Sequence, residues 1–592
     1  MRQFFITVAG VLTALIIAVF VVPVIIVAMV ASSFAPAEEP LPDQMVVTLD
    51  LSTPIVQQRT PFFAFADTHT TLTLADLHAG LKRAAADDAV AALYIRGGDG
   101  FVNAATADEI VEALAPFRAA GKPVYGFAQD ILETGLADYQ VLAQAQTIWM
   151  QPTGSFMPAG LSGRLPYAKQ ALDEIGITAD AVAFREYKGA MDIFTATQMS
   201  APQREANQRM VDMIYANLAT RIAEGRGFAA ADLDAALEAA PFGAHQARTA
   251  GLVDDLAYER QVLDVVMEGL SDEADFVALA DYAASRATAT RDANAGVIAV
   301  IYGEGAIMPG ESTPVSPFGG EATIGSDTMA NAILDASEDE DVKAILVRIN
   351  SPGGSASASD QVWDAIRAAQ AKDIPVIASM GSVAASGGYY IPAGADLIIA
   401  NPTTVTGSIG VIGAKFSLGG LLEKIGVNVD AVSSNPNADI WASDIPFSDE
   451  QRQRFSAWLE TAYEDFKQRV AEGRELSPAE TESIAKGRIW VGMDARDKGL
   501  VDRLGGFSTS LAAARELAGL EVDAPVELRA FPKPKTFQEE LFGLALNAEA
   551  AVRTLTLMSA LADHPEVSAL VREITARDSA QVQHRARVPV VQ

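Results

Sequence analysis

The beginning of the chain is its most hydrophobic part. From Phe4 to Val30 there is no charged residue, and a membrane-spanning helix needs about 20 apolar residues. Arg2 precedes this stretch and Glu38 follows it, and positive charge stays on the cytoplasmic side of a membrane. We therefore expect residues 1–31 to form a cytoplasmic end and a single-pass anchor in a bacterial-type cytoplasmic membrane, with the rest of the chain on the outer side. The alternative is a cleaved signal peptide, whose apolar region is usually limited to about 15 residues.

Beyond this stretch, short apolar runs rich in β-branched residues alternate with helical patterns. Such alternation is typical of a largely parallel sheet covered by helices, which is an α/β fold. The expected strands are Val297–Tyr302, Ala344–Ile349, Ile374–Ala378 and Leu397–Ala400, and the expected helices are Asp327–Ala336, Ser359–Ala371 and Ser448–Gly473.

The chain also contains an internal repeat. Arg348 lies 252 positions after Arg96 in a similar context, and the sequence DEIGITADAV, which starts at residue 173, recurs as EKIGVNVDAV from residue 423. A repeat with this period is a whole domain. We expect a first domain over residues 45–290, a second over residues 295–525, and a C-terminal helical segment and tail over residues 526–592.

Composition excludes several classes of function. The net charge of −32 disfavours nucleic acid as a partner, because its phosphates would be repelled. The absence of cysteine removes disulfides, thiol nucleophiles and iron–sulfur clusters. None of the five histidines lies between residues 246 and 563, and no two have the spacing of metal ligands. We therefore expect no metal centre.

Two glycine-containing turns in the second domain are candidates for chemistry. The first, RINSPGGS, starts at Arg348, and the second, SMGSVAASGGYYIPAGAD, starts at Ser379. Each follows an expected strand, and Ser386 precedes an expected helix start, where a nucleophilic hydroxyl would be exposed. The backbone N–H groups of Gly354 and Gly387 could bind the oxyanion of an acyl-transfer reaction. The structural alternatives are a common turn and a helix cap.

A serine nucleophile needs a base, and the second domain has no histidine. A lysine can serve if burial lowers its pKa from about 10.4 toward 7–8. Lys188 is the first candidate, because it follows an apolar run and precedes the small residues Gly189 and Ala190. Lys415 is the second. For either lysine, the alternative is an ordinary solvated charge.

Four motifs resemble one family. They are INSPGGS, the SVAASGGYYI that contains Ser386, TVTGSIGVIG from Thr404, and YKGAMD from Tyr187. Together with the anchor and the duplication, they make the chain resemble signal peptide peptidase A (protease IV) in its long form. The resemblance implies two tandem crotonase-like domains, of the kind shared with the Clp protease, and a serine–lysine dyad.

The resemblance also assigns roles to residues. Ser386 would be the nucleophile, Lys188 the general base and Ser408 a serine that orients the lysine, while Gly354 and Gly387 would hold the oxyanion. The implied partners are cleaved signal peptides and other unfolded apolar peptides, the cytoplasmic membrane, and further copies of the chain in a bowl-shaped homotetramer. No cofactor is implied.

The repeat divides these residues between the two domains. The first domain has Thr134 where the second has Ser386, and Val102 where the second has Gly354. The second domain has Ala438 where the first has Lys188. This division predicts one composite site per pair of domains, with Thr134 a relic. The sequence leaves open whether the dyad forms within one chain or between chains, although the covalent linkage of the domains favours one chain.

Two other functions are compatible with such a sequence. A crotonase-type acyl-CoA enzyme would use the same oxyanion site on a thioester, but export and a serine at a helix start argue against it. A non-catalytic membrane scaffold of the same fold would suit the acidic surface and the long tail, but it would not need a complete dyad.

Overall fold

The computed structural model describes residues 40–58, 71–287, 296–314, 321–521 and 525–533. Within these ranges, no helix combines the length and the hydrophobicity needed to cross a bilayer. The expected anchor, Phe4–Val30, lies outside the described residues, as does nearly all of the expected C-terminal segment.

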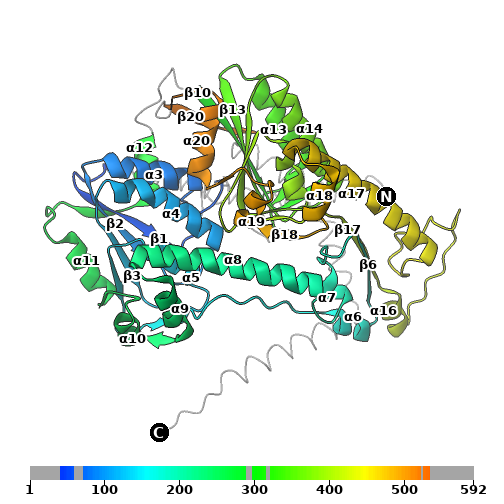
Figure 1. Ribbon diagram of the computed structural model, residues 1–592, viewed down its shortest axis with the longest axis horizontal. Coiled ribbons are helices and arrows are strands. Elements are labelled where there is room, and N and C mark those ends of the chain that lie inside the picture. The colour runs from blue at the N-terminus through cyan, green and yellow to red at the C-terminus, as the bar shows by residue number, and fades with distance from the viewer. Residues whose placement is uncertain (1–39, 59–70, 288–295, 315–320, 522–524, 534–592) are drawn as a thin grey trace, which may run out of the picture. The chain divides into compact units, whose positions relative to one another are not determined.

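The first domain is a parallel sheet of six strands (Figure 1). Its strand order is β8-β4-β3-β2-β1-β9. Neighbouring positions on β1 face opposite sides, so Val47 and Leu49 join a core with α3 and α4, whereas Val46 packs with α11. The strands are β1 (Met45–Asp50), β2 (Val90–Arg96), β3 (Val124–Ala128), β4 (Thr147–Met150), β8 (Asp255–Leu256) and β9 (Asp275–Ala278), and the main covering helices are α3 (Leu74–Ala86), α4 (Ala104–Ala119), α5 (Leu136–Leu142), α11 (Glu259–Met267) and α12 (Leu279–Ala287).

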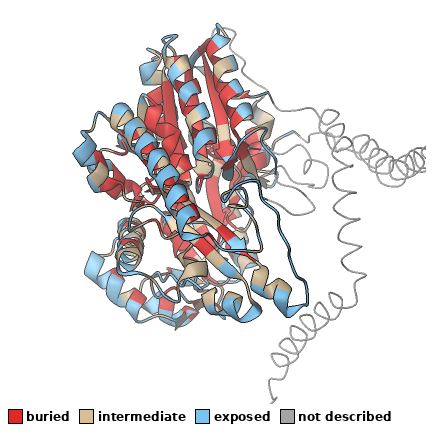
Figure 2. Cartoon of the chain, turned by 90° about the vertical axis from the view of Figure 1, so that its right-hand side faces the viewer, coloured by how far each residue is buried: buried red, intermediate tan, exposed pale blue. Residues whose placement is uncertain are grey.

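The second domain repeats this topology. Its sheet has eight strands, and six of them have the corresponding parallel order β19-β15-β14-β13-β10-β20. In addition, β16 (Val405–Gly407) pairs in parallel with β14, and β18 (Ile489–Val491) pairs antiparallel with β16. Buried residues are concentrated on the strands of the two sheets and on the helix faces that pack against them (Figure 2). The strands are β10 (Gly296–Glu304), β13 (Val342–Ser351), β14 (Val376–Ala385), β15 (Leu397–Ala400), β19 (Arg503–Leu504) and β20 (Val526–Phe531), and the main covering helices are α13 (Ser326–Glu338), α14 (Ala356–Gln370) and α20 (Phe507–Leu517).

Two details of the second domain differ from expectation. Its sheet continues past residue 525, because β20 pairs in parallel with β10 just as β9 pairs with β1. Only one residue of β20 is buried, so its sequence carries little of the apolar signal of a core strand. The helix expected over Ser448–Gly473 is α17 (Asp449–Arg474), and Ser448 caps its N-terminus. However, Gly473 lies inside the helix, and Glu475 adopts the left-handed conformation that ends it.

The two domains are joined by an arm that contains a strand from each. The strand β6 (Thr178–Ala183) of the first domain pairs antiparallel with β17 (Ile412–Ser417) of the second. Helix α6 (Lys169–Ile175) precedes β6, and α16 (Gly419–Lys424) follows β17. Long helices flank this arm, α8 (Ala201–Arg226) from the first domain and α17 from the second (Figure 1).

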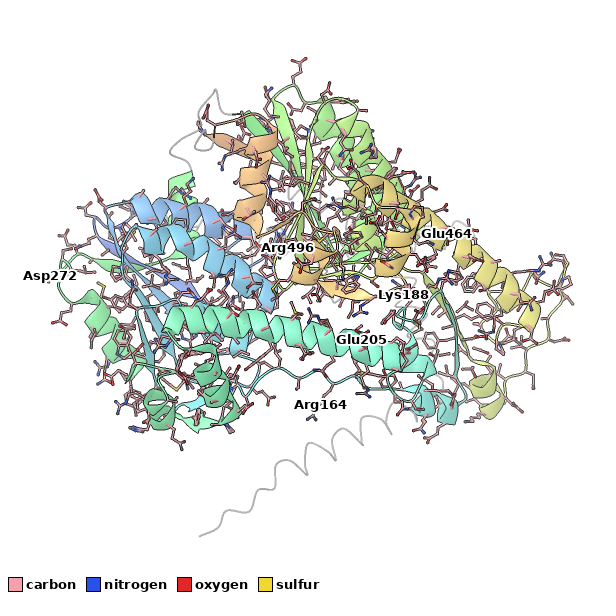
Figure 3. The ribbon with its side chains drawn as sticks, in the orientation of Figure 1. Arg164, Lys188, Glu205, Asp272, Glu464 and Arg496 are labelled. Atoms are coloured by element: carbon pink, nitrogen blue, oxygen red, sulfur yellow. The ribbon has the colours of Figure 1, made fainter. Side chains whose placement is uncertain are left out.

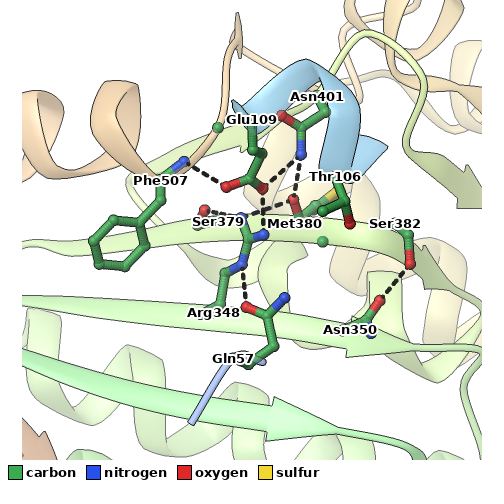
Figure 4. A network of polar contacts seen from close by, with 12 residues as sticks. Gln57, Thr106, Glu109, Arg348, Asn350, Ser379, Met380, Ser382, Asn401 and Phe507 are labelled. Carbon is green, nitrogen blue, oxygen red and sulfur yellow. Dashed lines mark hydrogen bonds and ion pairs between the residues drawn. The ribbon is translucent and has the colours of Figure 1, made fainter. Parts of the chain in front are cut away.

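A buried ion pair provides a second connection. Arg348 on β13 contacts Glu109 on α4, and Asn401 and the backbone N–H of Phe507 donate to the same carboxylate (Figure 4). Burial alone would raise the pKa of Glu109, but Arg348 holds it at about 2. Removing one partner of such a pair typically costs about 3–5 kcal/mol, because the other charge is left buried and unpaired.

Candidate active site

Ser386 lies at a sharp turn between a strand and a helix. β14 ends at Ala385, and α15 (Gly387–Tyr390) begins directly after the serine. Ser386 has φ 55° and ψ −122°, a strained backbone conformation for a residue with a side chain. Hydrogen bonds hold it there: its N–H donates to the carbonyl of Gly407, and its own carbonyl accepts from the N–H groups of Tyr389 and Tyr390.

Lys188 reaches this serine from the first domain. It follows β6 and lies beside the second domain, close to the end of the arm (Figure 3). Its Nζ is 3.0 Å from Ser386 Oγ, 2.9 Å from Ser408 Oγ and 2.8 Å from the carbonyl oxygen of Ser408. The structure thus brings together three residues proposed from the sequence, and Lys188 and Ser386 belong to the same chain.

The environment of Lys188 favours its neutral form. The side chain is buried, and burial lowers its pKa to about 7. Among the described residues, no carboxylate pairs with Nζ to oppose this effect. A neutral amine has a lone pair, so near neutral pH Lys188 can accept a proton from the neighbouring hydroxyl.

The two turns that carry the candidate N–H donors lie close together beside Ser386. A Cβ built on Gly387 would lie only 3.2 Å from the nitrogen of Gly354, and one built on Gly353 would lie 2.7 Å from Ser386 Cβ. Neither the N–H of Gly354 nor that of Gly387 donates to any residue that the structure describes. Gly353 has φ 107°, a conformation that favours glycine, and it lets the turn approach the serine.

In the first domain, the N–H groups at the corresponding positions already donate hydrogen bonds to the protein itself. The N–H of Val102, the counterpart of Gly354, donates to the carboxylate of Asp138, as do the N–H groups of Gly98 and Gly100. The N–H of Gly135, the counterpart of Gly387, donates to the carbonyl of Leu132. The region around Thr134 therefore offers no free pair of donors at the corresponding positions.

Lys415, the second lysine candidate, makes its described contacts away from Ser386. Lys415 lies on β17, where its Nζ donates to the carbonyls of Ile440 (2.9 Å) and Ala442 (3.2 Å) and lies over the ring of Phe447. These contacts belong to the packing of the arm.

A loop that the sequence did not single out encloses the lysine. The carbonyl of Lys486 accepts from the N–H of Tyr187, the N–H of Gly487 donates to Ile409, and the carbonyl of Arg488 accepts from the N–H of Ser408. A Cβ on Gly487 would lie 2.6 Å from Lys188 Cβ. The only local signal is a glycine between two basic residues, which indicates a turn and nothing about its partner.

Comparison with known proteins adds to this geometry. The sequence matches the profile of Peptidase family S49 over residues 116–272 and 368–521, and that of the Clp protease family over residues 322–406. The first profile covers slightly more than half of the chain. The chain belongs to peptidase family S49. It is therefore a serine protease, built from tandem α/β domains of the Clp protease type.

Named relatives of this peptidase agree with the assignment. Protease 4 of Salmonella typhi is 35% identical, over 70% of this chain and 66% of its own length. Protease 4 of Haemophilus influenzae is 32% identical, over 71% of this chain and 69% of its own length. A chloroplastic protein of Arabidopsis thaliana, named serine protease SPPA, is 29% identical, over 82% of this chain and 72% of its own length.

Proposed function

We propose that this peptidase hydrolyses peptide bonds with a dyad of Ser386 and Lys188. The observation that carries the proposal is the 3.0 Å contact between Ser386 Oγ and the Nζ of a lysine whose pKa burial lowers to about 7. A base must be within hydrogen-bond reach of the proton it removes and must be unprotonated at the working pH. Lys188 meets both requirements.

The reaction would proceed through an acyl-enzyme. Neutral Lys188 takes the proton of Ser386 as Oγ attacks the peptide carbonyl. The N–H groups of Gly354 and Gly387 stabilise the oxyanion, and a donor of this kind is worth about 3–4 kcal/mol in other acyl-transfer enzymes. The lysine ammonium then protonates the departing amine. In the second half, Lys188 removes a proton from water, which attacks the ester and releases Ser386. The two contacts of Nζ with Ser408 keep the amine aimed at Oγ.

The substrate and the location follow from the family resemblance. We propose that the substrates are cleaved signal peptides and other unfolded apolar peptides. They would be met at the outer face of the cytoplasmic membrane, where the stretch Phe4–Val30 would anchor the chain as a single span. The assembly would be a homotetramer, whose enclosed sites would exclude folded proteins.

The test uses the full chain in detergent with a leucine-rich signal peptide, followed by mass spectrometry. We expect the parent to cleave the peptide, Ser386→Ala and Lys188→Ala to lose turnover, and Lys415→Ala to keep it. Circular dichroism would establish that each variant is folded. Full activity in either dyad variant would refute the assignment of that residue. A folded parent that cleaves no unfolded peptide would favour the scaffold, and turnover of an acyl-CoA thioester would favour the crotonase-type enzyme.

A further inference from the structure

The segment that carries Lys188 into the second domain has no regular secondary structure. It lies between β6 and α7 (Asp192–Thr195), and Arg185 within it has a φ of 81°, an uncommon conformation for a residue with a side chain. A segment outside helices and strands has no hydrogen-bonded ladder of its own to fix it. The position of the Lys188 amine therefore depends on the contacts that the segment makes with its surroundings.

Two exposed ion pairs connect this segment to the second domain. Arg185 Nε lies 3.3 Å from a carboxylate oxygen of Glu482, and Lys486 Nζ lies 3.3 Å from a carboxylate oxygen of Glu186. The four side chains are 30–46% exposed. Ion pairs with this exposure contribute little, because water screens them. A stronger contact is needed to fix the lysine.

A largely buried arginine makes that contact. The side chain of Arg488 is 19% exposed. Its guanidinium lies over the ring of Tyr187, the residue before Lys188, at 5.1 Å from the centroid, and over the ring of Trp490 at 4.4 Å. Its Nη2 donates to Glu205 Oε1 at 2.6 Å and its Nη1 to the hydroxyl of Tyr187 at 3.3 Å, and this hydroxyl donates to Glu205 Oε2 at 3.1 Å. We call Tyr187, Glu205 and Arg488 the clamp.

The clamp connects elements of both domains around the lysine. Glu205 lies near the start of α8 in the first domain (Figure 3), and Arg488 directly precedes β18 in the second. The backbone carbonyl of Arg488 also accepts from the N–H of Ser408, whose two oxygens contact Nζ of Lys188. Arg488 thus holds the segment that carries the base through its side chain, and the serine that orients the base through its backbone.

We propose that Arg488 and Glu205 are positioning residues for Lys188, and that their contacts with Tyr187 keep the amine buried against Ser386 Oγ. This inference rests on the proposed function, because it concerns the base of the proposed dyad. Neither residue touches the reacting atoms. The planar guanidinium can stack on a ring and donate to a carboxylate at the same time, which a lysine at this position could not reproduce.

Loss of the clamp would act on Lys188 through its burial. Burial is the cause of the lowered pKa of Lys188, and no neighbouring charge contributes to it. Once the segment is released, water reaches the amine, and its pKa rises toward the ordinary value of 10.5. The charged groups around the segment are three basic and three acidic residues, Arg185, Lys486, Arg488, Glu186, Glu205 and Glu482.

The opposite charges of the clamp separate positioning from electrostatics. If the two side chains acted on Lys188 as charges, removal of the Arg488 cation would raise the lysine pKa, and removal of the Glu205 anion would lower it. If they act by holding Tyr187, both removals raise it. The direction of the two shifts therefore decides between the explanations.

The test is the pH profile of kcat/KM for the leucine-rich signal peptide, with the full chain in detergent. We expect Arg488→Met and Glu205→Ala each to raise the apparent pKa of the rising limb by about one unit, which lowers kcat/KM at pH 7 about five-fold. Arg488→Lys keeps the charge but loses the stacked plane, so it should behave like Arg488→Met. Circular dichroism would establish that each variant is folded.

Arg209→Met is the matched control. Arg209 also lies on α8, one turn after Glu205, and its guanidinium pairs with Asp494 of α19 (Gly492–Asp497) at 2.8 and 3.1 Å. This ion pair connects the same helix to the second domain, but it does not include the segment that carries the lysine. We expect Arg209→Met to keep the apparent pKa of the parent.

A second measurement needs no turnover. Neither Arg488 nor Glu205 titrates between pH 7 and 10, and the buried amine makes the free energy of unfolding rise with pH in this window. We expect this rise, measured by urea unfolding, to be smaller in Arg488→Met and Glu205→Ala than in the parent, and unchanged in Arg209→Met.

Three results would overturn the proposal: an apparent pKa unchanged in both clamp variants, shifts of opposite sign, or an equal shift in Arg209→Met. Failure of the proposed function has a different signature. It would show as a parent without peptidase activity or as full turnover in Lys188→Ala. A parent with a limb near pH 7 and clamp variants that match it would refute the clamp alone.

Discussion

At the scale of the residue, the chemistry depends on how one amine is buried. The Nζ of Lys188 contacts three oxygen atoms, and none of them belongs to a carboxylate among the described residues. These oxygens can accept hydrogen bonds from the amine, but they carry no negative charge that would stabilise its ammonium form. This differs from Lys467, whose ammonium pairs with Glu464 and Glu482, which raise its pKa above the ordinary value. Under the proposed mechanism, a lysine is thus a base at position 188 and a structural cation at position 467.

The first prediction at this scale concerns the pH dependence of cleavage. Only neutral Lys188 can accept the proton of Ser386, and burial lowers the lysine pKa to about 7. We therefore expect kcat/KM for an uncharged peptide to rise with pH and to level off above an apparent pKa near 7. Steady-state assays at fixed ionic strength would measure the profile. A rising limb near the ordinary lysine value of 10.5 would mean that Lys188 stays protonated in the folded enzyme.

The second prediction concerns stability. Between pH 7 and 10.5 the unfolded chain holds a proton on Lys188 that the folded chain has lost, so the stability of the parent rises with pH in this window. Lys188→Met lacks this contribution. We expect the parent to gain on the order of 3 kcal/mol relative to the variant between pH 7 and pH 10, as measured by urea unfolding.

An exposed lysine provides the control for that experiment. Lys343→Met replaces an exposed lysine on β13 and controls for the loss of one lysine side chain. If the free energy of unfolding changed with pH equally in the parent and in Lys188→Met, the buried neutral amine would be contradicted.

At the scale of the element, the loop Lys486–Arg488 fixes the two segments that carry Lys188 and Ser408. We predict that Gly487→Ala will lower turnover strongly although it removes no reacting group. Gly487 has φ 77°, and a Cβ there would lie 2.6 Å from Lys188 Cβ and 2.7 Å from its backbone nitrogen. The lysine must therefore move, and a displacement of about 1 Å can cost 10²-fold in rate.

Gly519→Ala is the matched control for this variant. Gly519 has a similar φ of 67°, but nothing lies within 4 Å of the position that its Cβ would take. Both variants place an alanine at a positive φ, but only Gly487→Ala adds a clash with Lys188, so only this variant should lose kcat. Equal activities in the two variants would show that the loop does not position the lysine.

The elements differ in how far their sequences could predict them. The strand Leu397–Ala400 has the predicted bounds, and β13, α13 and α14 lie within a few residues of theirs, because each has a regular apolar pattern. The pairing of β6 with β17 could not be predicted, since most of its residues are either partly buried or exposed and its partners are more than 200 positions apart. For the site, unusual residue types pointed to Ser386 and Lys188. Gly487 acts only through its approach to another segment, which no local pattern encodes.

At the scale of the whole molecule, duplication has been followed by division of the site. In the second domain, the N–H groups of Gly354 and Gly387 beside Ser386 donate to no described residue, whereas in the first domain Asp138 and Leu132 accept from the corresponding groups. The first domain instead supplies Lys188 through the arm. Neither domain has both halves of the dyad, so the covalent link between them matters for the chemistry.

This division leads to the last prediction, a test of mixed assemblies. In the structure, Lys188 contacts Ser386 of its own chain at 3.0 Å. When Ser386→Ala and Lys188→Ala chains are co-expressed with different tags and purified through both, each chain still lacks one half of its own dyad. We therefore expect the mixed assembly to remain inactive on the signal peptide. If the dyad formed between neighbouring chains, some sites would combine a parental Lys188 with a parental Ser386, and activity would return. Mixtures of either variant with the parent should keep activity in proportion to the parental chains, which would show that mixing itself does no harm.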